Sequence, residues 1–183
     1  MDVQRVEKHI IKPSNKYYTM LDNFCFLSKN LYNHANYVLR KEFINNGRTV
    51  PYGDLDKMLK ADGEHPDYRA MPTAQSAQQV LRLLEKNWKS FFRSIKDWAK
   101  HQEKYAGKPK LPKYKKKDSR NILILTNQNA KLKDGVLKFP KTFNGFELKL
   151  RCVKLEHFHA FNQIRFIPKQ GYITAEIVYS ISI

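Results

Sequence analysis

The densest group of side chains that could bind a charged ligand lies in a basic segment from residue 104 to residue 120. From residue 108 onward it holds seven Lys and Arg residues and one acid, Asp118, and it is interrupted by Pro109 and Pro112. Prolines donate no N–H and favour an extended backbone, so the segment can present its cations along a phosphate backbone. A solvated linker is the alternative interpretation. The predicted nucleic-acid-binding residues here are Lys108, Lys110, Lys113, Tyr114, Lys115, Lys116, Lys117 and Arg120.

A second candidate interface is the polar face of a long helix predicted to follow Thr73, which is placed to cap its N-terminus. Apolar side chains recur at helical spacing from Ala77 to Trp98, and this spacing assigns the stripe, including Trp88, to the core. Amide and cationic side chains on the opposite face can contact base edges, sugars and phosphates. A plain solvated face is the alternative. The predicted contact residues are Gln75, Gln78, Gln79, Arg82 and Lys86.

Residues that could bind a metal or act as catalytic acids are sparse. Cys152, His157 and His159 are close in sequence, but no second cysteine pair completes a zinc-binding pattern. Cys25 and His34 are nine residues apart on one predicted helix, too far to share an ion. The acids are scattered, whereas a two-metal nuclease needs several carboxylates that converge on two cations. We therefore predict no bound metal or other cofactor and no catalytic residue in this chain.

The composition favours a polyanionic partner. Among 183 residues, 34 Lys and Arg stand against 17 Asp and Glu, which gives a formal net charge of +17. Small soluble domains usually carry a net charge of about 2–8, and a larger field attracts nucleic acid. Aromatic residues make up 13% of the chain, and rings beside cations are typical of proteins that bind RNA or single strands.

The sequence also bears on the location of the protein and on an anionic membrane surface, which is the main alternative to nucleic acid as the partner. The sequence has no apolar stretch long enough to span a bilayer and no opening signal peptide, so we expect no membrane partner. Two cysteines imply no disulfide framework, which fits a reducing environment. We therefore predict a cytoplasmic protein.

Three zones of sequence would position these side chains. Residues 1–15 are predicted to form a strand and a turn, residues 16–105 a helical region, and residues 106–183 a basic linker followed by further strands. Asp134–Gly135, Asn144–Gly145 and the residues before Gly171 predict hairpin turns. The first strand is expected to join the later ones, and about six strands suffice for a small barrel. The predicted fold class is α+β, a small antiparallel β-barrel with a helical domain inserted after its first strand.

Several short motifs occur in a characteristic order along almost the whole chain. They are Leu31-Tyr-Asn-His34, Tyr52-Gly53, Gln78-x-x-Leu81, Trp88-Lys-Ser-Phe-Phe92, Lys110-Leu-Pro-Lys-Tyr-Lys115, Leu125-Thr-Asn127 and Ile164-Arg-Phe-Ile167. In this order they resemble the amino-terminal half of the TnpB family, transposon-encoded RNA-guided nucleases related to the type V CRISPR effectors. The resemblance implies an OB-like wedge β-barrel and an inserted helical recognition domain.

In that family, this half binds the guide RNA and the target DNA and recognises a short motif beside the target. The positions that match the motif-recognising residues are Tyr52, Gln75, Gln78 and Thr126, whereas a lysine typical of that helix start is replaced by Ala74. Family members continue into a RuvC-like nuclease domain, and this chain stops at Ile183. The resemblance therefore implies either a split nuclease with a second, RuvC-like protein chain that holds Mg²⁺, or a truncated relative. The alternatives are a stand-alone RNA-guided DNA-binding regulator and a generic RNA-binding or RNA-chaperone protein.

Overall fold

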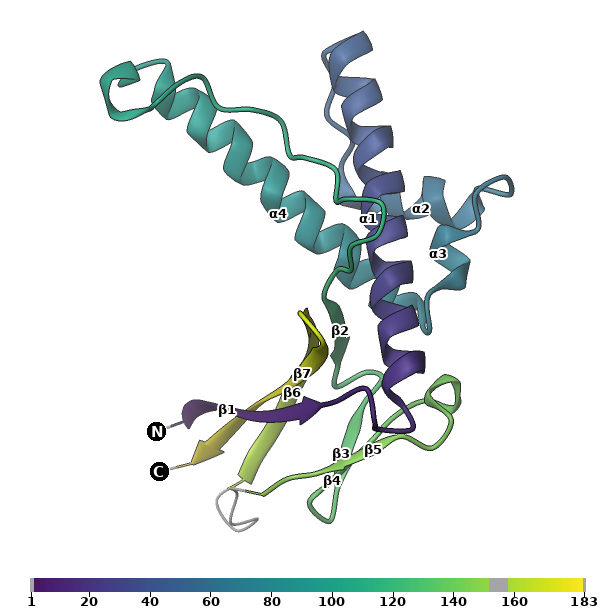
Figure 1. Cartoon of the computed structure of the whole chain (residues 1–183). Coiled ribbons are helices and arrows are strands. Elements are labelled where there is room, and N and C mark those ends of the chain that lie inside the picture. Colours follow the sequence, from purple (N-terminus) through teal and green to yellow (C-terminus); the bar gives the residue numbers. More distant parts are fainter. Residues whose placement is uncertain (1, 152–157, 183) are drawn as a thin grey trace.

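The computed structural model describes residues 2–151 and 158–182 and has a mixed α+β architecture (Figure 1). The strands are β1 (Asp2–Ile11), β2 (Leu123–Thr126), β3 (Lys131–Lys133), β4 (Val136–Lys138), β5 (Glu147–Lys149), β6 (Phe158–Lys169) and β7 (Tyr172–Ser182). The helices are α1 (Tyr18–Asn46), α2 (Tyr52–Ala61), α3 (Asp67–Ala70) and α4 (Ala74–Trp98), with 3-10 turns η1 (Gln102–Lys104) and η2 (Lys141–Phe143). All four α-helices lie between β1 and β2 in the chain, and the predicted division into domains stays a prediction.

The strands form two antiparallel sheets. The larger has the order β1-β7-β6-β2, and the smaller has the order β3-β4-β5. β1 pairs along its whole length with β7, from Asp2 opposite Ser182 to Ile11 opposite Ile173, so the two ends of the described chain lie side by side (Figure 1). The prediction that the first strand joins the later strands is therefore confirmed.

The predicted closed β-barrel is wrong, because within the described residues the two sheets share no strand pair. Past the end of β5, the backbone N–H of Arg151 donates to the carboxylate of Glu7 on β1 at 2.8 Å, and the same oxygen lies 2.7 Å from Nε2 of the buried His9. At this point the chain after β5 therefore meets β1 through a side chain and not through a backbone ladder. The strands of the small sheet are three residues long and supply few ladder bonds of their own.

Aromatic side chains hold the two sheets and α1 together. Phe143 of η2 lies against Phe139, which follows β4, and Phe166 of β6, with ring centroids 5.2 and 6.2 Å away, so the segments beside the small sheet share one core with the larger sheet. Phe24 of α1 packs on the same Phe143 ring at 5.0 Å. Burying an aromatic side chain of this kind stabilises the fold by roughly 1.5–3 kcal/mol. The lower part of α1 is therefore fixed on the sheets, while its upper part stands clear of them (Figure 1).

Local signals in the sequence set the element boundaries. At the start of α4, the Ser76 N–H donates to Thr73 Oγ1 at 3.0 Å and the Thr73 N–H donates to Ser76 Oγ at 3.2 Å, which confirms the predicted cap. Asp134–Gly135 has positive φ at both residues and joins β3 to β4, as predicted. Asn144–Gly145 also has positive φ, but it joins η2 to β5 and is not a two-residue hairpin between strands.

The apolar stripe of α4 is buried only along its first half. Ala77, Leu81, Leu84 and Trp88 are buried, which confirms their assignment to the core. The last turns of α4 point away from α1 (Figure 1), and Phe91, Ile95 and Trp98 are half-buried there. The Trp88 Nε1–H donates to Oδ1 of the buried Asn36 at 3.0 Å, which ties α4 to α1.

Candidate nucleic-acid interface

The backbone of the basic segment is fixed along α1 by polar side chains of that helix. The Asn33 amide pairs with both backbone groups of Lys115, since its Nδ2 donates to the carbonyl at 2.9 Å and its Oδ1 accepts from the N–H at 2.8 Å. Asn36 Nδ2 and Arg40 Nη1 both donate to the Pro112 carbonyl, at 3.0 and 2.9 Å. The segment, which forms neither helix nor strand here, is therefore docked along a helix.

The docking continues toward the sheets. Lys29 is 4% exposed and donates from Nζ to the Lys117 carbonyl at 2.7 Å, and burial lowers the pKa of its ammonium group. Arg120 forms a two-pronged ion pair with Asp22, with N–O distances of 3.0 and 2.9 Å. The α1 partners thus run down the helix as the segment numbers rise, so the segment lies antiparallel to α1 on its way to β2 (Figure 1).

This backbone docking leaves most of the predicted cations in solvent. The exposed ones are Lys108, Lys110, Lys113, Lys116 and Lys117. Lys115 is half-buried, with its ammonium 4.9 Å from the ring centroid of Tyr32. Tyr114 is 46% exposed beneath the Arg40 guanidinium, which lies 4.9 Å from its ring. Arg120, by contrast, has its guanidinium engaged by Asp22.

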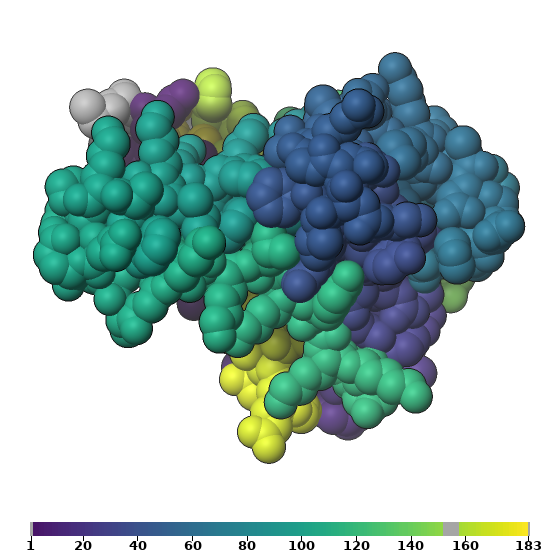
Figure 2. Space-filling model, turned by 90° about the horizontal axis from the view of Figure 1, so that it is seen from above, coloured from purple at the N-terminus to yellow at the C-terminus, as the bar shows by residue number. Residues whose placement is uncertain are grey.

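A groove of about 270 Å³ separates the basic segment from α4. Ser90 and Ser94 of α4 form one wall, and Lys110 and Lys113 of the segment form the other. Tyr32 also lines the groove, and its hydroxyl accepts from Asn87 Nδ2 at 2.9 Å. Figure 2 views this side of the molecule from above and shows the segment (green) on the surface beside α4 (teal). Hydroxyls, cations and a ring around one groove suit phosphate and sugar contacts.

The residues predicted to recognise a sequence motif lie at the opposite, N-terminal end of α4. The Arg82 guanidinium lies over the Tyr52 ring, 4.3 Å from its centroid. Burial raises the pKa of the Tyr52 hydroxyl. Gln78, one helical turn before Arg82, interacts with the Tyr68 hydroxyl, which itself donates to Asp56 at 2.7 Å. Tyr52, Gln78 and Arg82 are therefore brought together between α2 and α4.

Gln75 and Thr126, the other two residues predicted to recognise a motif, are linked where β2 ends. Asn129 donates from Nδ2 to Oε1 of Gln75 at 3.2 Å and accepts from Oγ1 of Thr73 at 2.9 Å. The Asn129 N–H in turn donates to the Thr126 carbonyl at 3.0 Å, so one loop residue links Gln75 with Thr126. Gln79 is half-buried on α4. Lys86 is exposed further along the same helix.

Sequence reasoning missed the α1 residues that hold the basic segment. Asp22, Lys29, Asn33, Asn36 and Arg40 recur at spacings of three, four and seven residues, so they form one polar stripe on α1. This spacing is the sequence signal that could have predicted a polar docking face on α1.

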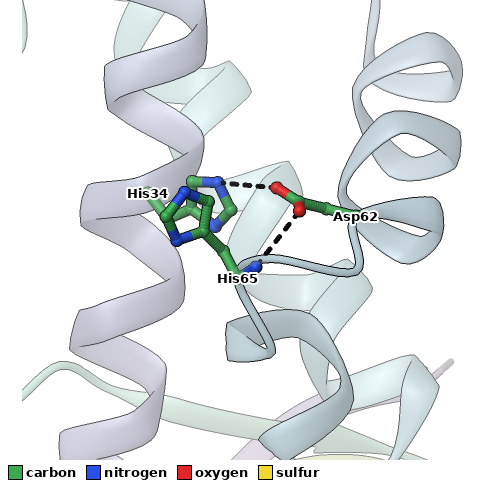
Figure 3. A group of neighbouring side chains, drawn as sticks. All are labelled: His34, Asp62 and His65. Atoms are coloured by element: carbon green, nitrogen blue, oxygen red, sulfur yellow. Dashed lines mark hydrogen bonds and ion pairs between the residues drawn. The ribbon is translucent and has the colours of Figure 1, made fainter.

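Among the described residues, one group of three side chains is close enough to share a metal ion: His34, Asp62 and His65 (Figure 3). Cys152 and His157, considered above as ligands, lie outside the described residues. Cys25 is a buried free thiol, and burial raises its pKa to about 12. A thiol in this state is a poor ligand and a poor nucleophile.

No protein-family model and no curated protein matches this chain. The resemblance to the TnpB family therefore stays a prediction. None of the helices in the described part of the chain is both long and apolar enough to cross a bilayer.

Proposed function

We propose that this protein binds RNA through the basic segment and the groove beside α4. The observation that carries the proposal is the fixed backbone of the segment. Side chains of α1 bind the Pro112 carbonyl and both backbone groups of Lys115, while the side chains of Lys110, Lys113, Lys116 and Lys117 stay exposed. Ordering a free backbone costs roughly 1–2 kcal/mol per residue, and a segment already ordered avoids that cost on binding. The net charge of +17 supports the same partner.

We further propose that the RNA is a guide and that the chain is the wedge and recognition lobe of a TnpB-like effector. The order of one strand, a set of helices and further strands supports this, as does the closeness of Gln75 to Thr126. In this proposal the wedge is a pair of open sheets. Target DNA binds against α4, and the catalytic carboxylates with their Mg²⁺ belong to a RuvC-like partner.

The first experiment tests RNA binding with two variants of equal charge. One replaces Lys113, Lys115, Lys116 and Lys117 with Ala, and its control replaces four exposed lysines near the small sheet, Lys131, Lys133, Lys138 and Lys141. Each lost phosphate contact makes the plot of log affinity against log salt shallower by about 0.7–0.9, so the segment variant should lose a slope of about 3. Equal losses in both variants would show that general charge, not the segment, binds the RNA.

The second experiment tests the guide-dependent part. The chain is purified with its RNA, the RNA is sequenced, and matching DNA with randomised flanks is selected for binding. Gln78→Ala should reduce flank discrimination by about 1–3 kcal/mol, whereas Gln102→Ala on η1 should not. RNA binding without any guide-matched DNA binding would contradict this part alone and favour an RNA chaperone.

A further inference from the structure

The connection between α2 and α3 brings two of its residues against α1. Asp62 is the C-cap of α2, His65 lies in the loop that follows, and His34 lies midway along α1 (Figure 3). We propose that these three side chains bind one divalent transition-metal ion of the zinc class. Imidazole nitrogens and a carboxylate oxygen are ordinary zinc ligands.

The spacing of the ligand atoms fits such an ion. One nitrogen or oxygen from each of the three side chains lies within 4.8 Å of the others. His34 Nε2 is 3.4 Å from Asp62 Oδ2. Two ligands about 2.0–2.1 Å from a tetrahedral zinc ion are about 3.3 Å apart, so this pair already has the required separation. A small rotation of the exposed His65 side chain would bring in the third ligand.

The second nitrogen of His34 supplies an independent observation. Its Nδ1 atom is buried and makes no hydrogen bond of good geometry, yet Asp67 Oδ2 lies only 3.2 Å away. The short distance decides between these two observations, because a slight rotation of the His34 ring would align a hydrogen bond from Nδ1–H to the Asp67 carboxylate. A metal-bound histidine characteristically donates its other N–H to a carboxylate, which fixes the ring. Asp67 is therefore assigned as the residue that positions His34.

Protonation of His34 is the alternative explanation for its two carboxylate neighbours. A neutral imidazole carries a single N–H, so one of the two nitrogens would otherwise face a carboxylate with its lone pair. The His65 ring lies beside that of His34, with ring centroids 4.8 Å apart, so one ion can bind both rings in their neutral form.

Three protein ligands leave one coordination position for water or an anionic oxygen. A surface pocket beside the two histidines is lined by His34, His65 and Asp67 together with Asn30, Asn33 and Tyr37 of α1. The bound ion would join α1 to the α2–α3 connection, beside the ion pairs of His34 with Asp62 and Asp67 and its ring contact with His65.

The test uses the 183-residue chain without a polyhistidine tag, stripped with EDTA and titrated with Zn²⁺ by calorimetry and with Co²⁺ by visible absorption. We expect one ion per chain and a higher melting temperature with Zn²⁺. His65→Ala and Asp62→Asn should each lower the affinity about tenfold or more, and Asp67→Asn should lower it by about 10–100-fold. His101→Ala, which changes a histidine outside the cluster, is the control.

The variants are chosen so that folding does not decide the result. His65 is exposed, and Asn at position 62 keeps an oxygen that can accept the N–H groups of Glu64 and His65. Circular dichroism checks that each variant is folded. Binding of less than about half an ion per chain, or affinity that is the same in His65→Ala and in the wild type, would overturn the proposal.

Discussion

Replacing Asn33 with Ala tests how the basic segment is held. The Asn33 side chain forms two hydrogen bonds with the backbone of Lys115, one as donor and one as acceptor. The substitution removes both and leaves the Lys115 N–H and carbonyl without these partners. Asn36 and Arg40 still hold the carbonyl of Pro112, so we expect the segment to open locally around Lys115 while the rest of the fold persists.

The expected magnitude follows from the two bonds. Each hydrogen bond contributes about 0.5–1.5 kcal/mol net to stability. The substitution should therefore destabilise the docked state of the segment by about 2 kcal/mol relative to the open state. A change of 1.4 kcal/mol is a factor of ten, so the open fraction should rise about thirtyfold. Hydrogen exchange measured by mass spectrometry should show correspondingly faster exchange of the amides from 113 to 117. Asn23→Ala, at an exposed position of the same helix, is the control.

The same variant also separates docking from RNA binding. If a fixed backbone is what makes the lysines effective, RNA affinity should fall in Asn33→Ala although no cation has been removed. Unchanged exchange from 113 to 117 would refute the docking argument. Faster exchange with unchanged RNA affinity would refute the link between docking and binding.

Three further predictions concern stability. Trp88→Phe should lower the free energy of unfolding in urea by about 1–3 kcal/mol, because the buried Asn36 oxygen loses its donor. Trp88→Ala should lower it by about 3–5 kcal/mol. Unchanged stability in both variants would place Trp88 outside the core. Cys25 should resist alkylation at pH 8 until the protein unfolds. Above pH 9.0 the unfolded thiol ionises while the folded one, with a pKa of about 12, does not, so this group makes stability fall as pH rises through that window, and Cys25→Ala should lack this slope. Asp22→Asn should lower the free energy of thermal unfolding by about 1 kcal/mol, because it breaks the ion pair with Arg120. An unchanged free energy of unfolding would show that this ion pair does not stabilise the fold.

Elements whose boundaries depend on neighbouring residues were predictable. Thr73 caps α4 through Ser76, three residues away, and Asp134–Gly135 forms a turn through its own backbone angles. Both signals lie within a few residues of the structure that they set. The first strand was also predictable, as was its joining of the later strands, although no nearby residue indicates that its partner is β7.

Closure of the sheets was not predictable, because it depends on contacts between distant residues. A count of six or seven strands permits a barrel but does not require one. One contact between β1 and the end of the small sheet involves Glu7, a charged strand residue that is only 5% exposed. Its carboxylate accepts the Arg151 N–H, and no local pattern indicates that pairing.

The candidate metal site shows the same limit. Cys25 and His34 were predicted to be too far apart on one helix to share an ion, and this stays a prediction. The partners of His34 come instead from the connection after α2, which folds back on α1. Asp62 and His65 are three residues apart, but His34 lies 28 residues before Asp62, so spacing in the sequence does not indicate that the three side chains meet.

The docked segment explains how one stretch of chain can be both structural and available for binding. An extended backbone must satisfy its N–H and carbonyl groups, and in a sheet it does so against another strand, which leaves alternate side chains on each face. Here side chains of α1 supply the partners, as Asn33 does for Lys115 and Asn36 for Pro112. The prolines reduce the number of N–H groups that need partners. The exposed Lys113, Lys116 and Lys117, which follow the prolines, therefore stand on a backbone that other side chains hold, and this arrangement suits the phosphate-binding surface proposed above.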